Sequence, residues 1–207
     1  MNKILMTAFQ PFGGENENSS IKLLEMLPDH IGNARIIKKI LPAVYQKSFE
    51  VLEELIQAEH PQAVVATGQA AGRVSMHFER FAINAMHARI RDNKGNKPDD
   101  EIIDPEGPAA YRCALDLKSM ADAAFAAGCP AAVSHFAGTF VCNDLYYRLL
   151  SRLEGGIVPG LFVHIPAAPG QIEGHKLPGV EPELCRDGLV AALRAGFSAI
   201  IEGESNA

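Results

Sequence analysis

The sequence lacks any apolar run long enough to cross a membrane. A membrane-spanning helix needs about 18 or more consecutive apolar residues, whereas the apolar runs here have the length of strands. The N-terminal stretch MNKILMTAFQPFGG has a single lysine and ends in a Pro-Phe-Gly-Gly turn rather than a small-residue cleavage site. We therefore expect a cytoplasmic protein with no membrane partner, whose cysteines stay reduced.

Signals for nucleic acid, metal and nucleotide binding are also missing. The formal net charge is −6, whereas nucleic-acid-binding domains are typically basic. None of the four cysteines belongs to a Cys-x-x-Cys pair, and no histidine pair has ligand spacing beside them, so we predict no metal. The PFGG and GQAAGR segments match neither a P-loop nor a dinucleotide fingerprint. Tight turns that bring backbone amides to a small ligand are the better interpretation, and we predict no cofactor.

The composition is that of a single globular domain spanning residues 1–207. With 47% hydrophobic and 21% charged residues the chain can bury a core without disulfides. Strand-like and helix-like segments alternate, which predicts a single-domain α/β/α sandwich with a mostly parallel twisted sheet and helices on both faces. The predicted strands span 3–8, 34–41, 63–68, 74–84, 131–138 and 161–166. The predicted helices span 19–29, 45–60, 108–128, 144–153 and 182–196, and 91–101 is predicted to be an exposed turn.

In such folds, functional sites form at the carboxyl ends of the strands. Cys142 follows the strand 131–138 and precedes the helix 144–153, and a helix N-terminus lowers the pKa of a thiol. This position suits a nucleophile, but on position alone a buried, inert cysteine is the commoner case. His164 ends the next strand, where it is either a core histidine or a general base. Because successive parallel strands are often neighbours, we expect Cys142 and His164 within hydrogen-bond reach.

A third group is needed to orient the imidazole of such a pair. Glu79 is an acid embedded in an otherwise apolar strand and is the candidate for this role. The alternative is that Glu79 faces solvent or pairs with Arg80. Asp104 and Glu106 lie in turn-like sequence, where we do not expect burial.

Four blocks of sequence resemble the motifs of the pyroglutamyl peptidase I family, also called the pyrrolidone-carboxylate peptidases. They are FQPFGG, GQAAGR…ERFAIN, SHFAGTFVCNDLYY and FVHIPAAP, which occur in the family's order over essentially the whole chain. The resemblance implies a cysteine peptidase that removes N-terminal pyroglutamate from peptides by acyl transfer through a thioester, with no cofactor. It also implies a homotetramer.

The same resemblance assigns roles to individual residues. Cys142 corresponds to the nucleophile, His164 to the base and Glu79 to the acid of the family's triad, and Arg89 to an arginine near the oxyanion site. The positions that match the lining of the pyroglutamyl pocket are Phe9, Phe12, Gln69, Phe140 and Val141. The three phenylalanines lie beside turns at strand ends, where they either pack in the core or wall a small apolar pocket.

Two turns depart from the family pattern. Asn18-Ser19-Ser20 stands where the family usually has Asn-Pro-Ser, and Ala71 takes one position of a double glycine. Both departures affect loop geometry more than the triad. A nucleoside-phosphorylase-like transferase is the alternative enzyme, but no phosphate site with converging Arg or Ser side chains can be assembled from the sequence. A noncatalytic binding module is the third interpretation.

Overall fold

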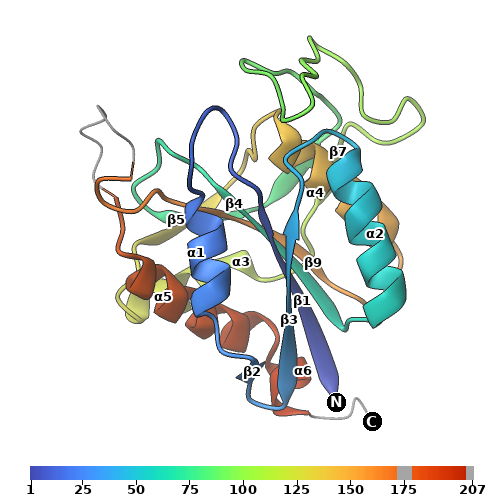
Figure 1. Cartoon of the computed structure of the whole chain (residues 1–207). Helices are drawn as coiled ribbons and strands as arrows, with labels where there is room; N and C mark the ends of the chain where they lie inside the picture. The colour runs from blue at the N-terminus through green and yellow to red at the C-terminus, as the bar shows by residue number, and fades with distance from the viewer. Residues whose placement is uncertain (172–178, 204–207) are drawn as a thin grey trace.

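The computed structural model describes residues 1–171 and 179–203, and a seven-stranded sheet forms its centre (Figure 1). Its strands are β1 (Asn2–Phe9), β2 (His30–Ile31), β3 (Ala34–Leu41), β4 (Ala63–Gln69), β5 (Met76–Glu79), β8 (Ala131–Ser134) and β9 (Gly160–Ile165). Their order across the sheet is β2-β3-β1-β4-β9-β5-β8. Only the β2–β3 and β5–β9 pairs of this sheet are antiparallel. The predicted mostly parallel sheet is therefore confirmed.

Helices cover both faces of this sheet (Figure 1). On one side lie α1 (Ser19–Met26), α3 (Leu117–Ala126) and α5 (Pro182–Gly196), and on the other lie α2 (Lys47–Glu59) and α4 (Val141–Leu153). The short α6 (Ser198–Glu202) packs near the start of β3. This arrangement confirms the predicted α/β/α sandwich, because β1, β3 and β9 each contact helices of both layers.

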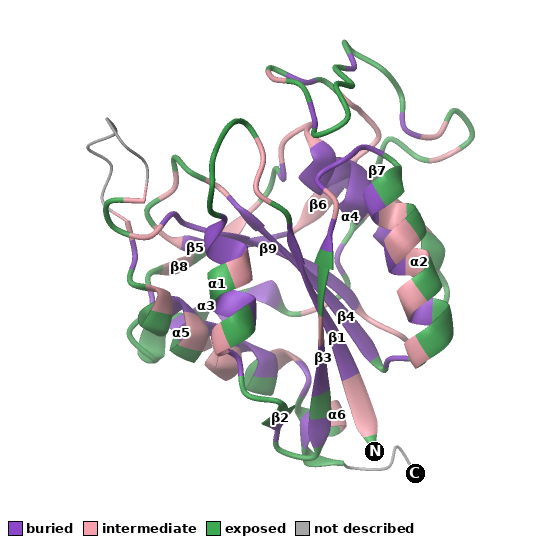
Figure 2. Ribbon diagram, in the orientation of Figure 1, coloured by how far each residue is buried: buried purple, intermediate pink, exposed green. Residues whose placement is uncertain are grey.

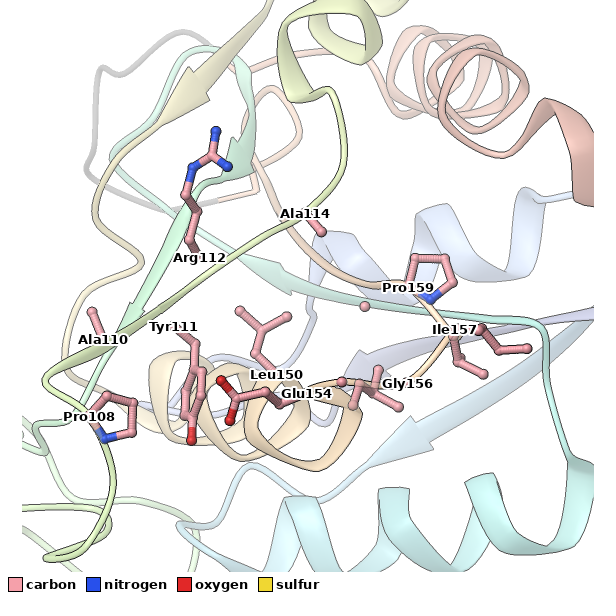
Figure 3. A pocket seen from close by; sticks show the side chains of 14 residues that line it. Pro108, Ala110, Tyr111, Arg112, Ala114, Leu150, Glu154, Gly156, Ile157 and Pro159 are labelled. Atoms are coloured by element: carbon pink, nitrogen blue, oxygen red, sulfur yellow. The ribbon is translucent and has the colours of Figure 1, made fainter.

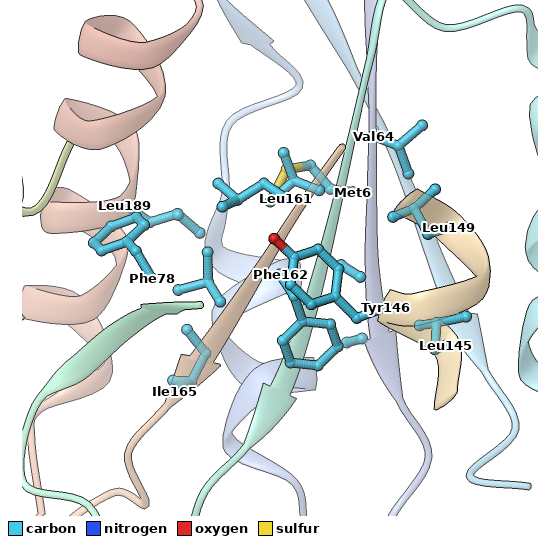
Figure 4. Packing of buried hydrophobic residues seen from close by; sticks show 14 of the residues in the cluster. Met6, Val64, Phe78, Leu145, Tyr146, Leu149, Leu161, Phe162, Ile165 and Leu189 are labelled. Atoms are coloured by element: carbon cyan, nitrogen blue, oxygen red, sulfur yellow. The ribbon is translucent and has the colours of Figure 1, made fainter. Parts of the chain in front are cut away.

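The core lies between the sheet and its two helical layers (Figure 2). All seven residues of β4 and all six of β9 are buried. The ring of Phe162 in β9 packs against Tyr146 of α4, with centroids 5.7 Å apart, and lies 6.4 Å from the ring of Phe9 (Figure 4). These contacts fix the distance between α4 and the sheet. This distance matters because the candidate nucleophile, Cys142, lies in the first turn of α4.

The predicted helix 108–128 is wrong in its first half. Ala110–Arg112 forms strand β7, which pairs antiparallel with β6 (Phe81–Ile83) in a separate two-stranded sheet. Within β7, the ring of Tyr111 lies 4.9 Å from that of Tyr147 in α4. Helix α3 begins only at Leu117, after Asp116 caps it by accepting a hydrogen bond from Ser119 N. Strand pairing and aromatic packing thus override the helix propensity of an Ala-rich segment.

The segment 74–84, predicted as one strand, divides at Arg80 into β5 and β6, which belong to different sheets. The predicted strand 131–138 is shorter than expected and ends at Ser134. The strands that precede Cys142 and contain His164, β8 and β9, are not neighbours either, because β5 lies between them. The expectation that they are adjacent is therefore wrong, and another element must bring the two residues together.

The turn between β2 and β3 provides a test of the packing at the base of the sheet. Gly32 has a φ of +57°, and a Cβ built on it would lie 2.6 Å from the backbone oxygen of Ile201 in α6. Gly95 also has a positive φ, but a Cβ there would meet no atom within 4 Å. We expect Gly32→Ala to lower the free energy of unfolding by about 1–3 kcal/mol more than Gly95→Ala, because only the first adds a clash to the backbone strain. Denaturant unfolding measures both values, and equal losses in the two variants would contradict the predicted contact.

Candidate active site

Cys142 lies inside the first turn of α4 rather than before it. The predicted helix 144–153 begins three residues earlier, at Val141, because the N–H groups of Asn143 and Asp144 both donate to the carbonyl of Phe140, at 3.0 and 3.2 Å. The backbone N–H groups of Val141 and Cys142 therefore belong to the open end of the helix, where they have no intrahelical acceptor. They are available to a negatively charged oxygen beside the thiol.

Two buried polar residues next to Cys142 hold this helix end in place. The side chain of Asn143 accepts from Ile83 N at 2.9 Å and donates to the Ile83 carbonyl at 2.9 Å, which fastens α4 to β6. Asp144 accepts from Gln46 N at 2.7 Å and from Nε of Arg148 at 2.8 Å. The sequence shows the two polar residues at the helix start but not their distant partners, so these anchors were missed.

Helix α4, and not strand adjacency, brings the thiol to the histidine. A Cβ built on Gly68 would lie 3.0 Å from Sγ of Cys142, so the thiol rests directly on this position of β4. Gly68 is the register partner of His164 in the β4–β9 pair, and neighbouring strands are about 4.8 Å apart. The structure thus places Cys142 and His164 side by side at the carboxyl end of the sheet.

His164 is oriented by a buried carboxylate. Its Nδ1 lies 2.7 Å from Oε1 of Glu79, whose side chain is fully buried. Glu79 ends β5, the strand paired with β9, and Tyr146 Oη donates to its backbone carbonyl at 2.9 Å. Glu79 therefore neither faces solvent nor pairs with Arg80. A hydrogen bond from Nδ1 to the carboxylate leaves the lone pair of Nε2 free to accept a proton.

Burial makes the resting pair a neutral thiol and a neutral imidazole. It raises the pKa of Cys142 to about 12, an effect that the charge of Glu79 reinforces. Burial also lowers the pKa of His164, against the opposing effect of Glu79. Burial raises the pKa of Glu79, but its hydrogen bond with His164 and the positive charge of Arg73 oppose burial, and the pKa is lowered overall. The predicted lowering of the thiol pKa by the helix end is thus wrong, because desolvation of the thiolate is the larger effect.

Four of the five predicted pocket residues divide into a half-buried pair and a core pair. Phe12 and Phe140 are half-buried, with ring centroids 5.6 Å apart, and Tyr45 packs edge-on against Phe140 at 5.5 Å. Phe9 and Val141 are almost fully buried in the core. The first pair thus offers an apolar surface beside the thiol-bearing helix, whereas the second pair belongs to the hydrophobic core.

Gln69, the remaining pocket candidate, is buried at the end of β4. Its Oε1 accepts from Ser19 N at 2.7 Å and from Nε2 of Gln171 at 2.6 Å. The Asn18-Ser19-Ser20 turn keeps its role as a helix start, because Oδ1 of Asn18 accepts from Ser20 N at 3.0 Å and caps α1. Ala71 is exposed in the turn that follows β4. Neither departure from the family pattern thus disturbs the triad.

Arg89 lies on an exposed segment that runs beside the loop leading into α4. Its side chain is exposed and takes part in none of the hydrogen bonds found among residues 1–171 and 179–203. Two residues earlier, His87 N donates to the Thr139 carbonyl at 3.1 Å and Thr139 Oγ1 donates to the His87 carbonyl at 2.8 Å. Arg89 is therefore near the start of α4 without being fixed there.

A cavity of about 490 Å³ lies at the other end of β9, between β7 and the end of α4 (Figure 3). Its lining includes Tyr111, Arg112, Glu154 and Ile157 but no cysteine or histidine, so it has no nucleophile to compete with Cys142. In the part of the chain that the structure describes, no group of three or more His, Cys, Asp or Glu side chains is arranged to hold a metal ion. No described helix has the length and apolar character needed to span a membrane.

Comparison with known proteins identifies relatives over nearly the full chain. A family model described as "Pyroglutamyl peptidase" matches residues 2–203. The pyrrolidone-carboxylate peptidases of Thermosipho melanesiensis and Escherichia fergusonii are 41% and 44% identical to the chain; each alignment covers 95% of this chain, and 98% and 92% of the relative, respectively.

Solved structures agree with these relatives. The crystal structure of pyroglutamyl peptidase I from Bacillus amyloliquefaciens superposes with a TM-score of 0.90 at 36% identity, over 97% of this chain and 98% of that one. The pyrrolidone carboxyl peptidase of Pyrococcus furiosus gives a TM-score of 0.90 at 33% identity, over 96% and 99% of the two chains. The chain is thus similar to these enzymes in both sequence and fold.

The contact between Gly68 and the thiol gives a prediction for this site. The Cβ of Gly68→Ala would press on Sγ of Cys142 and on the ring of Phe162, 3.1 Å away, so one of them must move by a few tenths of an ångström. We expect kcat/KM to fall at least about tenfold, because misplacing a reacting atom by about 1 Å costs roughly 100-fold, while the fold survives. Steady-state kinetics and thermal unfolding of Gly68→Ala and of Gly72→Ala, where a Cβ meets nothing within 4 Å, measure this. Wild-type activity in Gly68→Ala would place the thiol elsewhere.

Proposed function

The chain belongs to the pyroglutamyl peptidase family, cysteine peptidases that remove N-terminal pyroglutamate from peptides, and we propose that Cys142, His164 and Glu79 form its catalytic triad. The observation that supports these roles is the linked geometry of the three side chains. The thiol rests on Gly68, whose register partner His164 is hydrogen-bonded to the buried Glu79 at 2.7 Å. Family membership argues against the transferase and the binding module that the sequence left open.

In the proposed first step, Nε2 of His164 takes the proton of the Cys142 thiol as Sγ attacks the pyroglutamyl carbonyl carbon. Because both groups are neutral before the substrate binds, proton transfer accompanies attack. Glu79 stabilises the imidazolium that forms. The oxyanion accepts hydrogen bonds from the free N–H groups of Val141 and Cys142 at the start of α4, and Arg89 adds positive charge from the neighbouring segment.

The tetrahedral intermediate then collapses. The bond from the carbonyl carbon to the peptide nitrogen breaks, and His164 gives its proton to the departing amine, which leaves a thioester on Cys142. Water attacks this thioester with His164 as base. The carbon–sulfur bond breaks, the thiolate recovers the proton from His164, and free pyroglutamate is released. The cycle restores both groups without a metal or cofactor.

The pocket for the lactam ring is proposed beside the first turn of α4. Phe12 and Phe140 supply its half-buried apolar wall, and Phe9 and Val141 are the candidates for its buried part. Gln69 lies at the adjacent strand end, where backbone groups near it and near Phe140 hydrogen-bond the ring N–H and carbonyl. A neutral ring fits such a wall, whereas an ammonium group would be left unpaired in it.

The proposal extends to cellular location and assembly. The family resemblance supports a homotetramer. A cytoplasmic location is supported by the cysteines at positions 113, 129, 142 and 185, which are all free. Sedimentation equilibrium of the purified chain measures its assembly state, and a monomer would refute the tetramer without affecting the triad.

Substitutions in the triad test the proposed roles. We expect Cys142→Ala to reduce hydrolysis of a pyroglutamyl amide to background and His164→Ala to reduce kcat by at least about 10³-fold. Glu79→Gln should cost less, because the thiol and the oxyanion donors remain. The matched controls are Cys113→Ala, Cys129→Ala and Cys185→Ala, which remove equally buried thiols and should leave kcat close to wild type. Full activity in Cys142→Ala, or a loss confined to one of the controls, would show that another thiol reacts.

Substrate comparison tests the proposed lactam pocket separately. We expect kcat/KM for a pyroglutamyl amide to exceed that for the prolyl amide of the same chromophore by roughly 10⁴-fold. The prolyl ring lacks the lactam carbonyl and carries a protonated amine, so it leaves a pocket donor unpaired and buries a charge. A glutaminyl amide, which also carries an ammonium group, is the second comparison. Similar rates for prolyl and pyroglutamyl amides would refute this pocket even with Cys142 established as nucleophile.

A further inference from the structure

The carboxylate of Glu79 serves two donors with one oxygen. Oε1 accepts from Nδ1 of His164 at 2.7 Å and from Nη1 of Arg73 at 2.6 Å. Oε2 is buried and has no hydrogen-bond partner among residues 1–171 and 179–203. The oxygen that orients the imidazole is therefore also the oxygen held by the guanidinium, so Arg73 restrains the position of the carboxylate.

Arg73 is itself held in a fixed position. Nη1 lies 2.5 Å from Nδ1 of His77, and Nη2 donates to the carbonyl of Phe136 at 3.2 Å. Because a guanidinium only donates, Nδ1 of His77 must accept, so its proton is on Nε2, which lies 2.9 Å from Oγ of Ser75. Burial and the charge of Arg73 both lower the pKa of His77, which keeps this imidazole neutral.

We propose that Arg73 is a positioning residue of this active site, which fixes the Glu79 carboxylate against His164 and is held in turn by His77. The inference rests on the triad proposed above and adds to it a chain of contacts that leads from Ser75 through His77, Arg73 and Glu79 to His164.

The charge of Arg73 also acts on the protonation of His164, in the same direction as burial. His164 lies near Glu79 and His77 of β5 and Arg73 of the preceding loop, and the thiol of Cys142 rests on Gly68, the register partner of His164. The pKa of His164 is lowered by burial and lowered further by Arg73, while Glu79 acts in the opposite direction. Arg73 likewise opposes the rise that burial causes in the pKa of Cys142. The arginine thus keeps the imidazole free to accept a proton and favours the thiolate that results.

The test compares Arg73→Met, which keeps an unbranched chain but removes the charge and the donors, with Arg73→Lys, which keeps the charge. We expect Arg73→Met to lower kcat by roughly 10- to 100-fold, the effect of losing one hydrogen bond to a charged group. The acidic limb of kcat/KM against pH, which reports protonation of His164, should move to higher pH, since the imidazolium loses a nearby positive charge. Arg73→Lys should restore the limb and part of the rate. Arg35→Met, on the exposed face of β3, is the control and should match wild type.

A double-mutant cycle separates positioning from mere packing. In a Glu79→Gln background, Arg73→Met should cost little further activity, because the ion pair no longer exists. His77→Ala should lower the rate to a value between those of wild type and Arg73→Met. Additive losses in the cycle, or an unmoved acidic limb in Arg73→Met, would overturn the role of Arg73, and an unaffected His77→Ala would overturn that of His77. The Cys142→Ala result tests the proposed function independently, so the two failures are distinguishable.

Discussion

The buried hydrogen bond between Glu79 and His164 is the contact on which the site depends. It joins the end of β5 to the end of β9 and exists because these two strands pair antiparallel, with His77 opposite His164 in the register. A charged carboxylate with no solvent exposure is costly unless it is paired. Its pairing with His164 and Arg73 meets this cost and at the same time fixes the ring that must move a proton.

The thiol reaches this pair from a different direction. It is carried by α4. Hydrogen bonds hold the first turn of this helix, because Asn143 accepts from Ile83 N of β6 and Asp144 accepts from Gln46 N in the loop before α2. Gly68 then decides how low the helix sits, because only a residue without a side chain leaves room for Sγ on β4. The nucleophile, the base and the acid thus come from α4, β9 and β5. They meet near the carboxyl ends of β4 and β9, and sites in parallel sheets form at such strand ends.

The turn at Asn18-Ser19-Ser20 shows how a departure from a family pattern acquires meaning in a structure. Proline has no backbone N–H, so the hydrogen bond from Ser19 N to Oε1 of Gln69 is available only because a residue other than proline stands at this position. The same oxygen also accepts from Gln171. The substitution therefore connects the start of α1 to the strand end beside the thiol, while Asn18 still caps the helix.

The sequence by itself determined the class of fold, the family and the three residues that the structure brings together. Alternating apolar strands and amphipathic helices require a covered parallel sheet, and the bounds of β3 and α5 match the prediction residue for residue. These features are local, because period and capping depend on residues a few positions apart.

Only the tertiary structure decided the strand order, the conversion of residues 110–112 to strand, the start of α4 at Val141 and the contacts of Arg73. The first three depend on partners far away in the chain, such as Asn143 and Ile83, which are 60 residues apart, or Gln46 and Asp144, 98 apart. The contacts of Arg73 with His77 and Glu79 join residues that are near in the chain, but they depend on how the fold orients these side chains. The protonation of Cys142 was decided in the same way. Its pKa follows from how completely the fold excludes water around the sulfur, and no local pattern of residues specifies that burial.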